Sequence, residues 1–334
     1  MRVRWRIVVA LASLLVNAGF RAQAPAPDTP VLRPVADIPL PGPAVRFDYQ
    51  CIDTSANRLY ISHMNAGNLV VFDLEHRQVV ETIGDLPRIT GVLAVPALGK
   101  VYASVPGHHD VAVIDARTLH VTARVGSIGF PDGIACAPDV GRIYVSDESG
   151  GGELVIDGPS NRVVTTIPLG GEAGNTIYDP GSHHILVAVQ TTNEVVEIDP
   201  RVDRVIARHA LTGASHPHGM TVDASLRLLF VANEGNATLQ TVDLRTMEVV
   251  ATNAVGEDPD VLAFDPGWQQ LYVASESGGV SVFSEHSGKL TLRGHLDQPF
   301  AHTVSVDPRT HLVYFPLQNV EGHPLLRIMT ARDS

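Results

Sequence analysis

Two histidines flank a proline in the stretch TGASHPHGMTVDA, residues 212–224. A His-x-His pair of this kind could supply half of a metal site, because neutral imidazole is a common ligand of zinc and other transition metals. The same residues, His216 and His218, could equally belong to a loop in which only the proline matters. The choice depends on the elements that position them, and a repeat along the chain predicts those elements.

The chain repeats itself with a period of about 42 residues. Seven related segments each contain a bulky anchor residue, and successive anchors are separated by 42, 42, 42, 44, 42 and 42 residues. The anchors are Tyr60, Tyr102, Tyr144, Leu186, Phe230, Tyr272 and Tyr314. In the first five units an aspartate follows the anchor by 13 residues, as expected of a recurring turn.

Each repeat unit is expected to form four short strands. Runs such as NLVVFD and RQVVETI alternate apolar and polar residues, and Gly, Pro, Asn and Asp separate the runs. Four-stranded units of about 40–45 residues are typical of propeller blades. The sequence therefore predicts an all-β fold, a seven-bladed β-propeller.

The N-terminal strand is expected to close the ring. The seventh unit ends without a fourth strand, whereas the segment VLRPVADIPLPG precedes the first unit and matches the fourth-strand segment VVTTIPLGG at 163–171. Residues 31–41 should therefore pair with residues 325–331. This pairing would remove the open sheet edge that an incomplete blade leaves.

Two segments point to a known family. FVANEGNATLQTVD (230–243) and YVSDESGGGELVID (144–157) resemble the repeats of the YVTN-repeat β-propellers, exported bacterial proteins related to NHL-like propellers. The resemblance extends over residues 31–334. It implies the fold and export, and it says little about function, because propellers carry many different activities.

The N-terminus has the layout of a secretory signal peptide. Arginines precede an apolar run that is too short to span a bilayer, and Ala22-Gln23-Ala24 resembles a cleavage site. The expected organisation is a signal peptide over 1–24, a short tether over 25–30 and one propeller domain over 31–334. The protein is then expected in the periplasm or the medium, as a monomer without a membrane span.

Charge and cysteine usage exclude some partners and cross-links. Without the four arginines of residues 1–24, the chain has 20 basic against 36 acidic residues, a formal charge of −16. This balance disfavours nucleic acid as a partner. The two cysteines, Cys51 and Cys136, belong to blades that are not neighbours, so both are expected to be buried free thiols.

The repeat register gives His218 an equivalent in every blade. Pro217 aligns with Pro131 and Pro259, so this proline is expected to set the turn into the first strand. The first strands of all blades line the central channel, and the position of His218, the ring position, lies at the channel mouth. The ring residues are Asp48, Thr90, Asp132, Gly174, His218, Asp260 and His302.

A metal site is the most specific interpretation of this set. His218, Asp260 and His302 come from three consecutive blades and are predicted to bind one divalent ion, such as zinc or copper. No residue is assigned a catalytic role. Other residues expected to contact a ligand at the mouth are Asp48, Asp132, His216, Asp258, His63, Glu148, Glu234 and Glu276. Metal affinity should fall as the pH drops through roughly 6.5, the ordinary pKa of histidine.

Other interpretations stay open. These groups could carry out general acid–base chemistry, form an acidic funnel for a cationic or polyhydroxylated ligand, or be solvated side chains of a wet channel mouth. The sequence favours a binding or scaffold protein that recognises a small molecule, a metal or a protein partner at this mouth. The alternative is a metal-dependent hydrolase or lyase, by fold-level analogy with gluconolactonase-like propellers and virginiamycin B lyase.

Overall fold

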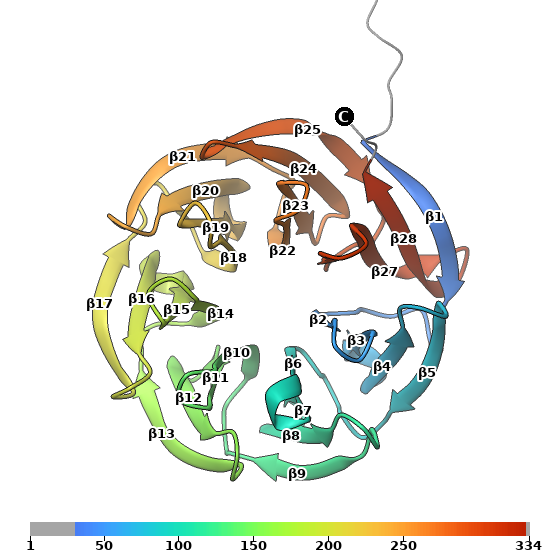
Figure 1. Ribbon diagram of the computed structural model, residues 1–334, viewed down its shortest axis with the longest axis horizontal. Coiled ribbons are helices and arrows are strands. Elements are labelled where there is room, and N and C mark those ends of the chain that lie inside the picture. Colours follow the sequence, from blue (N-terminus) through green and yellow to red (C-terminus); the bar gives the residue numbers. More distant parts are fainter. Residues whose placement is uncertain (1–30, 332–334) are drawn as a thin grey trace, which may run out of the picture. The chain divides into compact units, whose positions relative to one another are not determined.

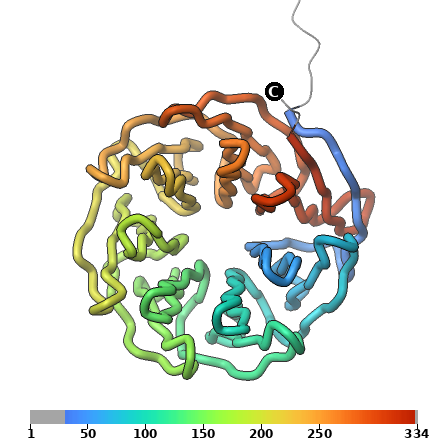
Figure 2. Tube along the Cα trace, in the orientation of Figure 1, coloured from blue at the N-terminus to red at the C-terminus, as the bar shows by residue number. Residues whose placement is uncertain are grey.

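Seven four-stranded antiparallel sheets form a ring around a central channel (Figures 1 and 2). The computed structural model describes residues 31–331. The expected all-β, seven-bladed propeller is therefore confirmed. The predicted signal peptide (1–24) and tether (25–30) lie outside the described residues. Within these residues, no helix has the length and apolar character needed to cross a membrane.

The first four blades follow one another along the chain, and the first-named strand of each lines the channel. Blade 1 is β2 (Gln50–Asp53), β3 (Arg58–His63), β4 (Asn68–Asp73) and β5 (Gln78–Ile83). Blade 2 is β6 (Val92–Val95), β7 (Lys100–Val105), β8 (Asp110–Asp115) and β9 (Val121–Val125). Blade 3 is β10 (Pro131–Ala137), β11 (Arg142–Asp147), β12 (Gly152–Asp157) and β13 (Arg162–Pro168). Blade 4 is β14 (Ala173–Asp179), β15 (His184–Val189), β16 (Glu194–Asp199) and β17 (Arg204–Ala210).

The last three blades complete the ring. Blade 5 is β18 (Pro217–Asp223), β19 (Leu228–Asn233), β20 (Thr238–Asp243) and β21 (Glu248–Ala254). Blade 6 is β22 (Pro259–Asp265), β23 (Gln270–Ser275), β24 (Gly279–His286) and β25 (Lys289–Asp297). Blade 7 is β26 (Ser305–Asp307), β27 (Leu312–Val320), β28 (His323–Ala331) and the N-terminal β1 (Leu32–Pro39). Single 3-10 turns occur at η1 (Met64–Ala66), η2 (Pro96–Leu98), η3 (Gln190–Thr192) and η4 (Glu234–Asn236).

The expected closure by the N-terminal strand is confirmed. Strand β1 pairs antiparallel with β28, from Leu32 opposite Ala331 to Pro39 opposite Leu325 (Figure 1). Leu32 is 1% exposed and packs into the hydrophobic core. The first strand of the chain thus protects the edge that the last strand would otherwise expose.

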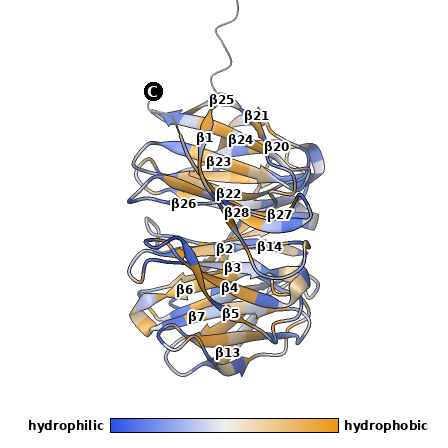
Figure 3. Cartoon of the chain, turned by 90° about the vertical axis from the view of Figure 1, so that its right-hand side faces the viewer, coloured by the Kyte–Doolittle hydropathy of each residue, from blue (hydrophilic) through white to orange (hydrophobic). Residues whose placement is uncertain are grey.

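The core consists of layers between neighbouring blades. One such layer joins Tyr144 and Val155 of blade 3 to Ile185 and Val196 of blade 4. All seven anchor residues of the repeat are at most 1% exposed. Figure 3 shows the corresponding distribution of hydropathy, with hydrophobic strands and more hydrophilic loops at the edges of the blades. Each blade therefore buries its apolar faces against two neighbours, as repeat proteins do.

Both cysteines are free thiols, as expected, although each is only partly buried. Burial raises the pKa of Cys51 and of Cys136 to about 11, so both thiols are protonated at neutral pH. Neither is therefore poised as a nucleophile.

Candidate metal centre at the channel mouth

The ring residues lie at, or just before, the start of the innermost strands. In blades 3 to 6 the pairing of the inner strand with its neighbour shifts register there, for example between Pro217 and Met220. Such a bulge redirects the side chain that it contains. The exposed fraction is 7% for His218, 3% for Asp260 and 6% for His302. These three ring side chains are thus buried, whereas Glu276, which also lines the mouth, is exposed.

A close approach between blades 5 and 6 fixes two of these residues relative to each other. Gly219 directly follows His218, and a Cβ atom at Gly219 would lie 1.5 Å from the backbone oxygen of Asp260. Likewise, a Cβ atom at Gly91 would lie 2.0 Å from the backbone oxygen of Asp132. Glycine after the ring position therefore allows neighbouring inner strands to meet closely.

Three glutamates reach the mouth from the loops that follow the second strands. In each of these loops the glutamate backbone N–H donates to the carbonyl oxygen of the residue two positions before the ring residue. The pairs are Glu148 with Phe130 (2.9 Å), Glu234 with His216 (3.0 Å) and Glu276 with Asp258 (2.8 Å). The repeat architecture thus holds the three side chains beside the ring.

Both nitrogens of the His218 imidazole face carboxylates. Its Nδ1 atom is 2.7 Å from Oδ1 of Asp260 and 3.6 Å from Oε1 of Glu234. Its Nε2 atom is 3.7 Å from Oδ2 of Asp132. A carboxylate behind an imidazole, on the nitrogen that does not bind metal, is a common feature of metal centres.

His302 contacts the other oxygen of the same aspartate. Its Nε2 atom is 3.0 Å from Oδ2 of Asp260 and 3.4 Å from Oδ1 of Asp48. Its Nδ1 atom is 3.5 Å from Oε1 of Glu276. The sequence-predicted ligands His218, Asp260 and His302 are therefore brought together, with Asp260 between the two histidines.

Two trios of side chains have the geometry to hold a cation. In each of them the donor atoms lie within 4.8 Å of one another, and the trios are His218, Glu234 and Asp260, and Asp260, Glu276 and His302. Buried atoms of this cluster lack hydrogen-bond partners among the described residues: Nδ1 of His218, Oδ1 of Asp260 and Nδ1 of His302. The 2.7 Å contact between His218 and Asp260 is short but not aligned as a hydrogen bond. Each of these atoms instead faces an oppositely charged group, and a shared cation would take the place of the imidazole protons between them.

The carboxylates raise the pKa of both histidines. Burial alone would lower the pKa of His218, but the charges of Asp260, Glu234 and Asp132 outweigh it and raise the value well above the usual one. Burial also opposes the charged form of His302, and Asp260 and Asp48 raise its pKa to about 10. A metal at this mouth must displace protons from imidazole at neutral pH. Metal affinity should therefore fall as the pH drops, in the direction that the sequence predicts.

The carboxyl groups divide into charged and neutral ones. Although burial favours its neutral form, the charges of His302 and His218 hold the pKa of Asp260 far below its usual range. Burial, with the charge of Asp48, raises the pKa of Asp132 well above its usual value. Burial raises the pKa of Glu234 to about 7, against the opposing charge of His218. Asp260 thus carries a negative charge between the two histidines at neutral pH.

Of the residues predicted to bind a ligand or a metal, His63, His216, Asp258 and His302 are not among those that line the mouth cavity, although His302 contacts Asp260 behind it. His63 is fully buried and stacks on Phe47, with ring centroids 4.1 Å apart. His216 and Asp258 are exposed and have φ values of 51°. The backbone is left-handed at both positions, just before the proline, and neither residue lines the mouth cavity.

The cavity also contains the ring residue Thr90 and two residues that the sequence did not single out, Arg46 and Tyr49. Arg46 donates from Nη2 to Oε1 of Glu276, and the hydroxyl of Tyr49 donates to Oδ2 of Asp132 at 3.3 Å. Thr90 donates from Oγ1 to the backbone oxygen of Pro131 at 2.8 Å. Arg46 stands two residues before a ring aspartate, a position that the register does supply. Tyr49 had no comparable signal in the sequence.

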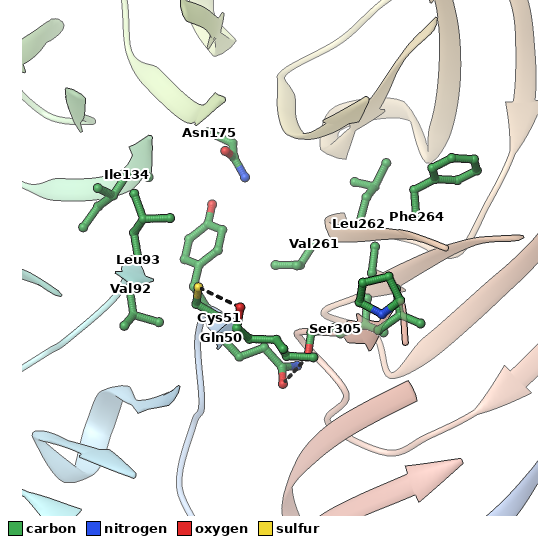
Figure 4. Close-up of a pocket in the computed structure, with 18 of the residues that line it drawn as sticks. Gln50, Cys51, Val92, Leu93, Ile134, Asn175, Val261, Leu262, Phe264 and Ser305 are labelled. Carbon is green, nitrogen blue, oxygen red and sulfur yellow. Dashed lines mark hydrogen bonds between the residues drawn. The ribbon is translucent and has the colours of Figure 1, made fainter. Parts of the chain in front are cut away.

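Two cavities follow the channel, and they differ in chemistry. The mouth cavity, about 160 Å³, is lined by Asp48, Asp132, His218, Asp260 and the three loop glutamates. A larger one, about 410 Å³, runs along the inner strands, with Val92 and Ile134 on one side and Val261 on the other (Figure 4). Its lining includes no carboxylate or histidine. The titratable groups therefore gather in the smaller cavity, and that is where the candidate chemistry lies.

The fold and the mouth define the protein as a seven-bladed β-propeller with a buried His/carboxylate cluster. It is similar to a solved structure of Kuenenia stuttgartiensis hydrazine synthase, with a TM-score of 0.75 and 16% sequence identity. The match covers 88% of this chain and 97% of the other. At that identity the similarity concerns the fold alone. No family model matches the chain, and neither does any curated protein. Membership of the YVTN-repeat family therefore remains an expectation from the sequence.

Proposed function

We propose that this protein is a metal-binding propeller that holds one divalent transition-metal ion at the channel mouth. His218, Glu234 and Asp260 would be the ligands. Asp132 would support His218 from its other ring nitrogen, and His302 would orient Asp260 through the second carboxylate oxygen. The observation that carries the proposal is the convergence of three donor atoms, one each from His218, Glu234 and Asp260, within 4.8 Å of one another at a buried position.

The spacing and type of the donors support zinc or a similar ion. In a tetrahedral site with bonds near 2 Å, ligand atoms lie about 3.3 Å apart. The contacts of His218 with Asp260 and Glu234, 2.7 and 3.6 Å, bracket that distance. An imidazole ligand favours a transition metal over calcium, which prefers oxygen alone. The cavity of about 160 Å³ suits an ion with its waters better than a larger organic ligand.

Export belongs to the same proposal and rests on the sequence of residues 1–24. A metal site on an exported protein would act in the periplasm or the medium. There the ion would either stabilise a binding face for a partner or be the bound ligand itself.

The test is metal binding by the purified chain without a histidine tag. The metal-free protein, titrated with Zn²⁺ by calorimetry at pH 8, should bind one ion per chain. His218→Ala should lower the affinity at least about 100-fold, because it removes a ligand. The matched control is His216→Ala, which changes the other histidine of the same motif and lies outside the cavity.

Identical isotherms for the wild type and His218→Ala would reject the site. Equal losses in His218→Ala and His216→Ala would place binding on the exposed loop instead of at the mouth. Circular dichroism of each variant checks that the ring remains folded. Metal analysis of the protein as purified from its host then identifies which ion it carries.

A further inference from the structure

The second trio at the mouth already contains a positive charge from the chain itself. Arg46 lies in the segment before β2 and is partly buried. Its Nη2 atom is 2.8 Å from Oε1 of Glu276 and 3.2 Å from Nε2 of His302. One nitrogen of the guanidinium thus contacts two of the three residues that could hold a cation there.

Without Arg46, the trio of Asp260, Glu276 and His302 would have the features of a cation site. Its donor atoms lie within 4.8 Å of one another. His302 is 6% exposed, and its Nδ1 atom, 3.5 Å from Oε1 of Glu276, has no hydrogen-bond partner among the described residues. An imidazole nitrogen and two carboxylates that converge in this way form a position that suits a positive ligand.

The two trios are fused through one carboxylate. Asp260 turns Oδ1 to His218 at 2.7 Å and Oδ2 to His302 at 3.0 Å. A carboxylate with one oxygen on each side can bridge two cations, as in two-metal centres whose ions lie about 4 Å apart. The mouth therefore has the ligand arrangement of a two-cation centre.

The two trios differ in their contacts with basic side chains. Within residues 31–331, no lysine or arginine forms an ion pair with His218, Glu234 or Asp260. On the other side, Arg46 forms one with Glu276. Two cations so close together repel strongly in a partly buried site, so the guanidinium opposes a second metal ion.

We propose that Arg46 is a built-in cation that fills the second half of a two-cation centre and limits the mouth to one metal ion. The inference rests on the proposed function for the ion at His218, Glu234 and Asp260. Arg46 is then a specificity-determining residue: it sets the number of ions bound. Removing its charge while keeping an apolar stem should turn the mouth into a site for two ions.

The test counts ions. Metal-free chain without a histidine tag is titrated with Co²⁺ by calorimetry, and the bound metal is counted after gel filtration. The wild type should bind one ion per chain and Arg46→Met two. Arg46→Lys keeps a positive charge and should bind one. The matched control is Arg88→Met, because Arg88 has the equivalent repeat position in blade 2, is exposed and packs over Phe130 at 5.0 Å.

Each outcome distinguishes this inference from the proposed function. Two ions in the wild type, or one in a folded Arg46→Met, would overturn the role of Arg46 and leave the first site standing. No binding by the wild type with one ion in Arg46→Met would reject the first site and keep the second. No binding by either protein would reject both. Two ions in Arg88→Met would show that a general loss of charge, and not the position of Arg46, sets the count.

Discussion

At the scale of single residues, a buried glutamate away from the mouth has a pKa that folding changes. Glu153 in β12 is fully buried, and Oγ1 of Thr176 donates to its Oε2 atom at 3.1 Å. Its Oε1 atom has no partner among the described residues. Burial raises the pKa of Glu153 well above its ordinary value of 4.5, so the folded protein keeps this group protonated.

This acid makes stability depend on pH. Below pH 4.5 Glu153 is protonated in both the folded and the unfolded chain, so it does not change the free energy of unfolding. Above pH 4.5 the unfolded chain releases the proton while the folded chain keeps it, so the free energy of unfolding falls by about 1.4 kcal/mol per pH unit until the raised pKa is reached. Glu153→Gln should therefore melt near the wild-type temperature at pH 4 and clearly above it at pH 8.

Melting curves of both proteins between pH 4 and 8 check this. Glu81→Gln, on an exposed residue, serves as the control and should follow the wild type at every pH. If the difference in melting temperature between wild type and Glu153→Gln does not change with pH, ionisation of Glu153 does not cause the pH dependence of stability. Glutamine keeps the acceptor for Thr176, so the comparison isolates the ionisable proton.

At the scale of elements, the close contact between β18 and β22 positions the metal ligands. Gly219→Ala places a Cβ atom against the backbone oxygen of Asp260 and 2.8 Å from Cδ1 of Leu262. The strands must separate, which should cost about 1–3 kcal/mol and displace Asp260 from His218. Zinc affinity should fall at least about tenfold.

The control for this change is a glycine with free space. A Cβ atom at Gly84 would meet nothing within 4 Å, so Gly84→Ala should leave both the melting temperature and the zinc affinity unchanged. Calorimetry and thermal melting on the two variants measure these effects. Wild-type affinity in Gly219→Ala would show that the close approach of the strands does not position the ligands.

The repeat register predicted which residues meet, but not how they are surrounded. The seven ring residues share one position in a 42-residue period, so their convergence follows from the sequence. The burial of His218 and Asp260 does not follow, because it depends on bulges and close contacts between blades that no pattern records. The repeat also does not encode the left-handed backbone at His216 and Asp258, which lie outside the cavity lining. Arg46 stands at a position that the register supplies, but its contacts with Glu276 and His302 depend on side-chain geometry that the repeat does not encode.

At the scale of the molecule, the ring brings together residues from both ends of the chain. Asp48 of blade 1 and His302 of blade 7 meet across the seam where the ring closes. Arg46 of blade 1 reaches Glu276 of blade 6. The contacts of Arg46 and Asp48 with blades 6 and 7 therefore form only in the closed ring. Closure in turn depends on β1, which pairs with β28 and not with a strand near it in sequence.

The strength of this closure can be measured by truncation. A chain that starts at residue 42 lacks β1 and two buried leucines, Leu32 and Leu40. Burial of each leucine contributes about 1.5–3 kcal/mol, so the truncated chain should be less stable by about 3–6 kcal/mol. It should melt at least about 6 °C below a chain that starts at residue 31. It also loses the double contact of Arg327 with Asp37, and it exposes β28 as an edge strand, so light scattering should detect self-association. Equal melting temperatures for the two chains would mean that contacts between blades hold the ring together. Strand β1 would then shield the edge of β28 from solvent without stabilising the fold.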